Sequence, residues 1–247
     1  MKQNIYIYDN FIDLINLIQY LIKNRIKPFN IKSNLYIPSI FDNLIYLKLD
    51  YDTKEFIRLI GKENFKIIYY VYLSNDENKE SIMFYFALNS YIYKEKVIYK
   101  RNLNCVNKAL KIFNYVKREN HRFKGFTRFK ELKNNIWYAE INPDNNIIEI
   151  LSLHFKKRLK NEIWIIKDIN RKIISLYNKK EYIILNEEEY QLIGLEFSYN
   201  ELEIEKLWKS FYHTIGIKER KNNRCRLNLM PKKYWPYIVE VVDEESS

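Results

Sequence analysis

The residues best suited to chemistry lie close together near the middle of the chain. Between positions 116 and 129, Glu119 and His121 stand beside Arg122 and Arg128, with phenylalanines between them. A carboxylate and an imidazole in a shared cleft could act as general acid and base. Guanidinium groups bind phosphate through paired hydrogen bonds. These residue types and spacings therefore point either to acid–base chemistry or to binding of a polyanion.

The positive charge of the chain supports the second of these interpretations. The formal net charge is +11, but the abundance of Lys together with Ile, Asn and Tyr is also typical of AT-rich codons. Arginine is the clearer signal, because only Arg25 and Arg58 precede residue 100 and all other arginines follow it. This asymmetry predicts a polyanion site in the C-terminal part of the chain.

Three histidines invite a catalytic or metal-binding hypothesis. His121, His154 and His213 are scattered and form no His-x3-His pair, so the sequence gives no metal site. The candidates for acid–base catalysis are His121, Glu119 and His154. The four glycines stand alone, which excludes a glycine-rich phosphate loop. We expect no cofactor in this chain, and the sequence leaves open whether it is an enzyme.

Apolar spacing predicts the elements that position these residues. The predicted helices cover 11–22, 53–59, 64–73, 79–92, 103–122 and 148–159, and the predicted strands cover 3–8, 45–49, 123–130, 136–142, 162–167 and 173–177. We expect an α+β fold with an antiparallel sheet over about 123–177, packed by helices. An N-terminal α/β part (1–100) extends that sheet or forms a separate lobe. The motif-bearing core is 101–240, and 241–247 is a disordered acidic tail.

The predicted strands 123–130 and 136–142 carry cations and aromatic rings on one face. Such a face suits neutralisation of a nucleic-acid backbone combined with base stacking. The alternative is an ordinary solvated face on which Arg128 or Lys130 pairs with Glu140 across the strands. The residues that we expect to contact phosphates are Arg118, Arg122, Arg128, Arg158, Arg220 and Arg224, and those expected to stack on a base are Phe126 and Tyr138.

The stretch 181–205 is strongly acidic and contains no Lys or Arg. One interpretation is a pair of solvated helix faces. The other is an acidic element that shields the basic surface until nucleic acid displaces it.

Several motifs resemble a bacterial family of domains of unknown function that are described as DNA metabolism or DNA repair proteins. The similar segments are 119–129, 137–144, 154–158, 164–168, 207–212, 217–222 and 230–235. The family's repeated motif positions correspond here to Glu119, His121, Arg122, Gly125, Arg128, Pro143, His154, Arg158, Asp168, Arg220, Asn222 and Pro231. The resemblance covers roughly residues 80 to 240.

What this resemblance implies is a role in DNA repair or modification beside a partner protein of the radical S-adenosylmethionine class. Some members are fused to a module like uracil-DNA glycosylase, which this sequence does not contain. The chain also lacks a Cys-x3-Cys-x2-Cys cluster site, so radical chemistry would belong to the partner. The family offers no catalytic mechanism to transfer.

The sequence also indicates the cellular location of the protein. Its longest apolar run, 67–73, is too short to span a bilayer, and its N-terminus has no signal-peptide pattern. Two cysteines are too few for a disulfide scaffold, so we expect a cytoplasmic protein with no membrane partner. The leading hypothesis is a DNA-binding accessory protein. The alternatives are an enzyme acting on DNA or a flipped nucleotide, and a protein-interaction module with a basic docking face.

Overall fold

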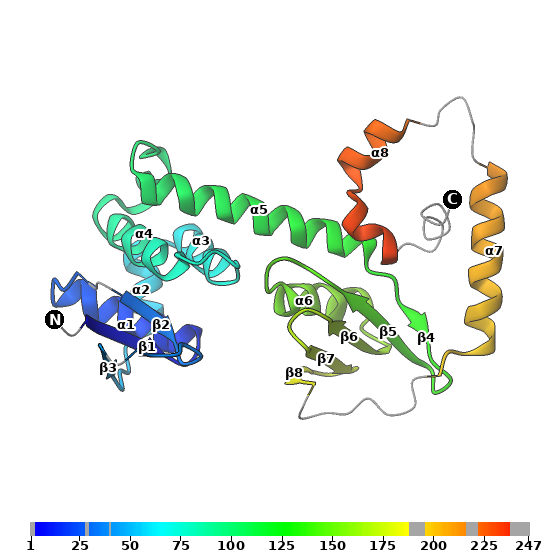
Figure 1. Cartoon of the computed structure of the whole chain (residues 1–247), viewed down its shortest axis with the longest axis horizontal. Helices are drawn as coiled ribbons and strands as arrows, with labels where there is room; N and C mark the ends of the chain where they lie inside the picture. The colour runs from blue at the N-terminus through cyan, green and yellow to red at the C-terminus, as the bar shows by residue number, and fades with distance from the viewer. Residues whose placement is uncertain (1–2, 28–29, 40, 188–195, 216–221, 238–247) are drawn as a thin grey trace. The chain divides into compact units, whose positions relative to one another are not determined.

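Two separate β-sheets, each with its own helices, organise the chain. A computed structural model describes residues 3–27, 30–39, 41–187, 196–215 and 222–237. It divides into two compact units, Met1–Arg118 and Glu119–Ser247. Figure 1 labels the elements along the chain. The predicted tail at 241–247 and the candidate Arg220 lie outside the described residues.

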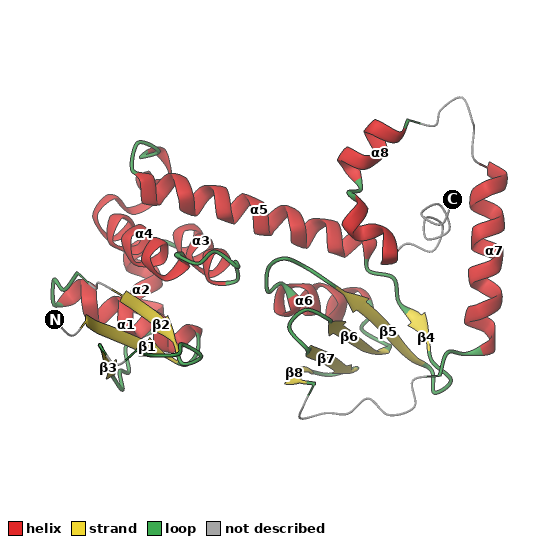
Figure 2. Ribbon diagram, in the orientation of Figure 1, coloured by secondary structure: helices red, strands yellow, loops and turns green. Residues whose placement is uncertain are grey.

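The first unit begins with a three-stranded parallel sheet. β1 (Gln3–Tyr8) lies between β2 (Asn30–Ser33) and β3 (Asp42–Tyr46). Parallel neighbours require a crossover connection, and α1 (Phe11–Lys23) supplies the one between β1 and β2. Figure 2 shows α1 alongside these strands. The buried face of α1 joins the hydrophobic core of this unit.

Helices complete the first unit. They are α2 (Thr53–Ile60), α3 (Lys62–Tyr72), α4 (Lys79–Tyr93), the short 3₁₀ helix η1 (Lys94–Tyr99) and the beginning of α5 (Asn104–Phe126). Gly61 separates α2 from α3 and adopts a φ of 92°, a conformation that glycine reaches without the penalty of a side chain. Buried residues of α2, α3 and α4 share one core with α1 and the start of α5.

The second unit is built on a mixed five-stranded sheet in the order β4-β5-β6-β7-β8. Its strands are β4 (Lys130–Glu131), β5 (Ile136–Ile141), β6 (Ile163–Asp168), β7 (Ile173–Asn178) and β8 (Tyr182–Asn186). β5 and β6 are parallel, and the other neighbouring pairs are antiparallel. The remaining helices are α6 (Ile148–Arg158), α7 (Tyr199–Ile215), α8 (Asn223–Leu229) and the 3₁₀ helix η3 (Lys232–Tyr237).

Helix α6 is the crossover between β5 and β6, and it covers one face of the sheet (Figure 1). Phe155 of α6 packs edge-on against Phe129, with ring centroids 4.9 Å apart. The hydroxyl of Ser152 donates to the hydroxyl of Ser175 on β7 at 2.7 Å, so these two buried hydroxyls are paired.

The predicted antiparallel sheet over 123–177 was wrong, and so was its possible extension by the N-terminal part. The sheet of the second unit is mixed, and the first unit has a parallel sheet of its own. The physical reason is the connection through α6, because parallel neighbours need a crossover of this length to return the chain to the same end of the sheet. The fold is therefore mixed α/β.

The predicted strand at 123–130 was also wrong. Helix α5 continues to Phe126, and only Lys130–Glu131 forms a strand. Phe123 and Phe126 lie on one helix face, and both rings contact Tyr234, with centroids 5.2 and 5.1 Å from it. This distant aromatic partner favours the helical period over the alternating pattern. The helices predicted at 11–22, 53–59, 64–73, 79–92 and 148–159 and the strands predicted at 3–8, 136–142, 162–167 and 173–177 were confirmed.

No helix in the described part of the chain is long and apolar enough to cross a membrane.

Candidate nucleic-acid interface

Glu119 is the centre of a buried polar network in the second unit. Its carboxylate is 2% exposed and accepts hydrogen bonds from the backbone N–H groups of Asp144 at 2.8 Å and Asn145 at 3.0 Å. The side-chain amide of Asn145 adds a third bond at 2.6 Å. A carboxylate that accepts several N–H donors is strongly held in place. Glu119 lies on helix α5 and therefore holds the turn after β5 against that helix.

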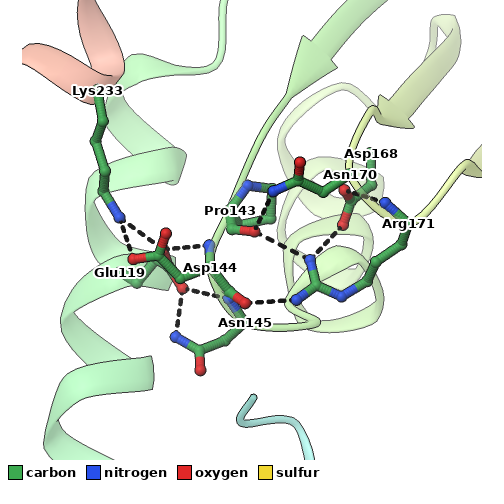
Figure 3. Close-up of polar contacts among 8 residues, drawn as sticks. All are labelled: Glu119, Pro143, Asp144, Asn145, Asp168, Asn170, Arg171 and Lys233. Atoms are coloured by element: carbon green, nitrogen blue, oxygen red, sulfur yellow. Dashed lines mark hydrogen bonds and ion pairs between the residues drawn. The ribbon is translucent and has the colours of Figure 1, made fainter.

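Lys233 connects the 3₁₀ helix η3 to the same network (Figure 3). Its ammonium donates to Glu119 at 3.1 Å and to the Asp144 carboxylate at 2.5 Å. Burial lowers the pKa of Lys233, but the two carboxylate partners outweigh burial and hold the pKa above its usual value. Lys233 therefore stays charged and ties the C-terminal segment to α5 and to the turn.

A second carboxylate completes the network at the end of β6. Asp168 is fully buried and accepts from the Arg171 guanidinium at 3.1 Å and from the Arg171 backbone N–H at 3.2 Å. The same guanidinium donates to the backbone oxygens of Pro143 at 3.0 Å and Asp144 at 2.5 Å (Figure 3). Burial raises the pKa of Asp168, and the Arg171 charge opposes that rise.

This network lies at the carboxyl ends of the parallel strands β5 and β6, where Ile141 pairs with Asp168. In the sequence, Asp168 stood out only as a motif position of the similar family, and Asn145, Arg171 and Lys233 had no predicted role. The available signal was the strand–helix–strand order, which places the turns after both strands at one edge of the sheet. Hydrogen bonds to the Glu119 and Asp168 carboxylates join α5, the turn after β5, the end of β6 and η3, so the role of the network is to position these elements.

The anchored segment carries a group of cations that we call the C-terminal basic cluster, formed by Arg122, Arg226 and Lys232. They surround two adjacent buried rings. The Arg122 guanidinium lies 5.8 Å from the Tyr234 ring, and the Arg226 guanidinium lies 4.6 Å from the Trp235 ring. The Lys232 ammonium lies 5.5 Å from the Trp235 ring. Cations within about 6 Å of a ring are attracted to its face.

Three elements thus contribute to the C-terminal basic cluster: the end of α5, α8 and η3. The Trp235 indole N–H donates to the Met230 backbone oxygen at 3.0 Å, which fixes the ring between α8 and η3. Within the described ranges, neither Arg122 nor Lys232 forms an ion pair. Residues more than 100 positions apart in the sequence therefore meet around the adjacent Tyr234 and Trp235 rings.

Several predicted contact residues have partners inside the second unit. The Arg128 guanidinium donates to Glu201 of α7 at 3.2 Å, and the Glu201 side chain is 6% exposed. Tyr138 is buried, its hydroxyl donates to Glu140 at 2.7 Å, and burial together with that carboxylate raises its pKa. Phe126 is half-buried against Tyr234. The structure places these three side chains in packing and pairing contacts.

The acidic stretch supplies partners for the cations of the sheet. Besides Arg128 with Glu201, these pairs are Lys130 with Glu205 at 3.5 Å, Lys167 with Glu187 at 2.6 Å, and Lys133 with Glu196. The cross-strand pairing of Arg128 or Lys130 with Glu140 is not the arrangement that the structure shows. Displacement of the acidic stretch by nucleic acid stays a prediction, and part of the stretch, 188–195, lies outside the described residues.

Three further predicted arginines, Arg118, Arg158 and Arg224, are exposed. Arg158 is at the end of α6, and Arg224 is on α8, the helix that also carries Arg226 of the basic cluster. Arg118 is the last residue of the first unit, where its Nε donates to the Asn114 backbone oxygen at 3.3 Å.

The three catalytic candidates occupy different environments. His121 is exposed, whereas the Glu119 carboxylate is occupied by four donors. The His154 ring lies edge-on to Phe155, with its buried Nε2 lacking a hydrogen-bond partner. No hydrogen bond described in the structure joins any two of these residues. Among the described residues, no cluster of His, Cys, Asp or Glu could hold a metal ion.

We expect His154 to make the stability of the protein depend on pH. Burial, followed by the charges of Lys124 and Arg158, lowers the pKa of His154 below its usual value. The unfolded chain therefore takes up a proton on this residue at a higher pH than the folded chain does. The resulting stability is present above about pH 6.5, the ordinary histidine value, and is lost as pH falls.

Urea unfolding of the full chain at several pH values between about 7.5 and 5 tests this expectation. The variant His154→Gln should show a smaller loss of unfolding free energy over that range. Lys124→Gln should raise the pKa of His154 in a histidine-ring NMR titration. An unchanged pH dependence in His154→Gln would contradict the prediction.

Comparison with known proteins now places the chain in a family. A family model described as DUF4130, a domain of unknown function, matches residues 77–240, well over half of the chain. The chain belongs to the DUF4130 family. The DUF4130 match includes the network around Glu119 and the C-terminal basic cluster, whereas the sheet of the first unit precedes it. No curated protein and no solved structure matches the chain.

The DUF4130 match confirms the part of the sequence resemblance that concerns a domain of unknown function. It does not address DNA repair, a radical S-adenosylmethionine partner or a glycosylase-like module.

Proposed function

We propose that the protein is a nucleic-acid-binding accessory protein whose contact surface is the C-terminal basic cluster. The observation that carries this proposal is the gathering of Arg122, Arg226 and Lys232, from three separate elements, around the Tyr234 and Trp235 rings. Contacts between the cations and the rings restrict the side chains before any ligand arrives. Less conformational entropy is then lost when they bind phosphates.

The buried rings decide the kind of recognition that this surface offers. Tyr234 and Trp235 are 1% and 6% exposed, so their faces are not available to stack on bases. Contacts from Arg and Lys to phosphates position a protein on nucleic acid but carry little sequence information. The surface therefore suits binding to the backbone, with an affinity that depends strongly on salt and weakly on sequence.

The finer parts of the proposed function rest on the sequence resemblance. We infer from it that the nucleic acid is DNA, that the context is repair or modification, and that a radical S-adenosylmethionine protein is the partner. The low cysteine content leads us to propose a cytoplasmic location. An enzyme acting on a flipped nucleotide gains no support from the paired state of Glu119.

Fluorescence anisotropy with a labelled single-stranded oligonucleotide tests the binding surface. We expect the double variant Arg122→Gln/Lys232→Gln to bind at least about tenfold more weakly, because two phosphate contacts are lost. The slope of log K against log salt should decrease in magnitude by about 1.4, at about 0.7 per contact for a single strand.

The matched control is Lys180→Gln, which removes an exposed cation in the turn between β7 and β8. It should leave both affinity and salt slope nearly unchanged. Equal losses in the control and the double variant would show that net charge, rather than this cluster, governs binding. Absence of salt-dependent binding by the unaltered protein would rule out the proposed function and favour an acidic protein partner.

A further inference from the structure

A cavity in the first unit lies where α2, α3 and η1 meet. Its volume is about 660 Å³, and it is lined by residues of these three helices. Cavities of a few hundred cubic ångströms are the size that small ligands occupy. The cavity lies entirely within the first unit, so it is separate from the C-terminal basic cluster.

The cavity wall carries three cations. Arg58 comes from α2, Lys62 from the first turn of α3, and Lys96 from η1. In the part of the chain that the structure describes, none of these three forms an ion pair. The carboxylates in the wall are Glu63, which lies 4.0 Å from Lys66 on its own helix, and Glu95. The balance of charge in the wall therefore favours an anion.

The backbone around the cavity is held by specific contacts. The buried Asn64 amide donates to the backbone oxygens of Ile60 at 2.7 Å and Lys94 at 2.9 Å, which joins α2, α3 and η1. Lys94 has a φ of 53°, an unfavourable value for a residue with a side chain, and its ammonium donates to the Leu59 backbone oxygen at 2.9 Å. Residues held in such conformations persist only where surrounding contacts impose them.

Part of the wall is apolar or aromatic. Ile57 and Ile98 line it, and Tyr99 stands at its edge with 79% of its surface exposed. An aromatic ring beside aliphatic side chains offers a flat apolar surface of the kind on which a nucleobase stacks. The cations and this surface lie in one cavity, which matches the two chemically different ends of a nucleotide.

We propose that this cavity binds a mononucleotide, with Arg58, Lys62 and Lys96 contacting the phosphate and Tyr99 contacting the base. A phosphate monoester carries a charge of about −1.5 to −2 at neutral pH, which three cations can neutralise. Guanidinium and ammonium groups both serve as phosphate ligands in proteins. The assignment is independent of the nucleic-acid surface in the second unit.

NMR spectroscopy of the ¹⁵N-labelled full chain, titrated with AMP, tests this site. Gly61 lines the cavity, and glycine amides resonate in a distinctive region of the spectrum. We expect a saturable shift of the Gly61 signal, with little change at Gly125 in α5. Adenosine and inorganic phosphate, each lacking one end of the nucleotide, should bind at least about tenfold more weakly, a difference of about 1.4 kcal/mol.

The variants Arg58→Gln and Lys96→Gln should each reduce AMP affinity, and Tyr99→Ala should reduce the preference for AMP over inorganic phosphate. Lys48→Gln is the matched control, because Lys48 is exposed in the same unit and does not line the cavity. Circular dichroism checks that each variant is folded. No saturable shift at about 10 mM AMP, where millimolar affinities are already saturated, would overturn the proposal. An equal loss in Lys48→Gln, or equal affinity for AMP and inorganic phosphate, would also overturn it.

Discussion

Replacing Glu119 with alanine is expected to lower the free energy of unfolding by about 3–5 kcal/mol, the usual cost of breaking a buried charge pair. The substitution removes the acceptor for the backbone N–H groups of Asp144 and Asn145 and for the side chains of Asn145 and Lys233. Asn145 is buried, so its backbone and side-chain donors would lose this acceptor away from water, and leaving a buried donor unsatisfied costs about 1–3 kcal/mol.

A graded series separates this effect from a simple change of charge. Glu119→Gln keeps the shape and one acceptor oxygen, so its loss of stability should be smaller than that of Glu119→Ala. Glu181→Ala removes a carboxylate from an exposed turn and should change stability by less than about 0.5 kcal/mol. Chemical denaturation followed by tryptophan fluorescence measures all three. A loss of unfolding free energy below about 1 kcal/mol in Glu119→Ala would contradict the stabilising role of the network.

Glu119→Ala should also weaken binding to nucleic acid in the molecules that remain folded. Glu119 holds Lys233, and Lys233 belongs to the 3₁₀ helix that carries Lys232, Tyr234 and Trp235. Loss of this anchor should reduce the order of the C-terminal basic cluster. The expected effect on affinity is therefore indirect, and the more conservative Glu119→Gln should show less of it.

Replacing Arg128 with alanine is expected to destabilise the fold by about 3 kcal/mol. The Arg128 side chain is 24% exposed and its Glu201 partner only 6%, so the variant leaves a carboxylate buried beside the sheet. Glu201 also accepts the Glu131 backbone N–H at 3.2 Å, which keeps it in place after the guanidinium is lost. We therefore expect Arg128 to contribute mainly to stability, in contrast to its predicted role as a phosphate contact.

A double-mutant cycle measures this pair directly. The double variant Arg128→Ala/Glu201→Ala should be less destabilised than the sum of the two single variants, with a coupling energy of at least about 1 kcal/mol. The exposed pair of Lys206 and Glu203, on the same helix as Glu201, is the control and should give below about 0.5 kcal/mol. Additive effects in the Arg128 cycle would show that the pair contributes no coupling.

The helix boundary near Phe126 shows why part of the site could not be predicted. Phe123, Gly125, Thr127 and Phe129 alternate as they would in a strand, and the same sequence also fits a helix that buries Phe123 and Phe126. The spacing of these residues is compatible both with the two-residue period of a strand and with the 3.6-residue period of a helix. The choice depends on Tyr234, a residue more than 100 positions away, whose ring packs on both phenylalanines.

Charge patterns were similarly incomplete as a guide to the site. Arg122 and Arg128 have the same chemistry and lie six positions apart, but Arg122 reaches the basic cluster and Arg128 is paired with Glu201. No sequence rule separates the two residues, because their partners come from the distant elements η3 and α7. The parallel pairing of β5 and β6 was accessible in principle, since the predicted order of strand, helix and strand is the usual connection between parallel neighbours.

The sequence by itself determined the type and position of most helices and strands, the excess of positive charge, and the resemblance to a family of unknown function. These properties depend on local periodicity and composition, which can be read from short stretches of the chain without knowledge of long-range contacts. Only the tertiary structure decided that the sheet is mixed, which cations pair with carboxylates, and that Glu119 and Lys233 anchor the C-terminal segment. Each of these depends on pairing between residues distant in sequence, where burial makes an unpaired charge or polar group costly and so selects one set of partners.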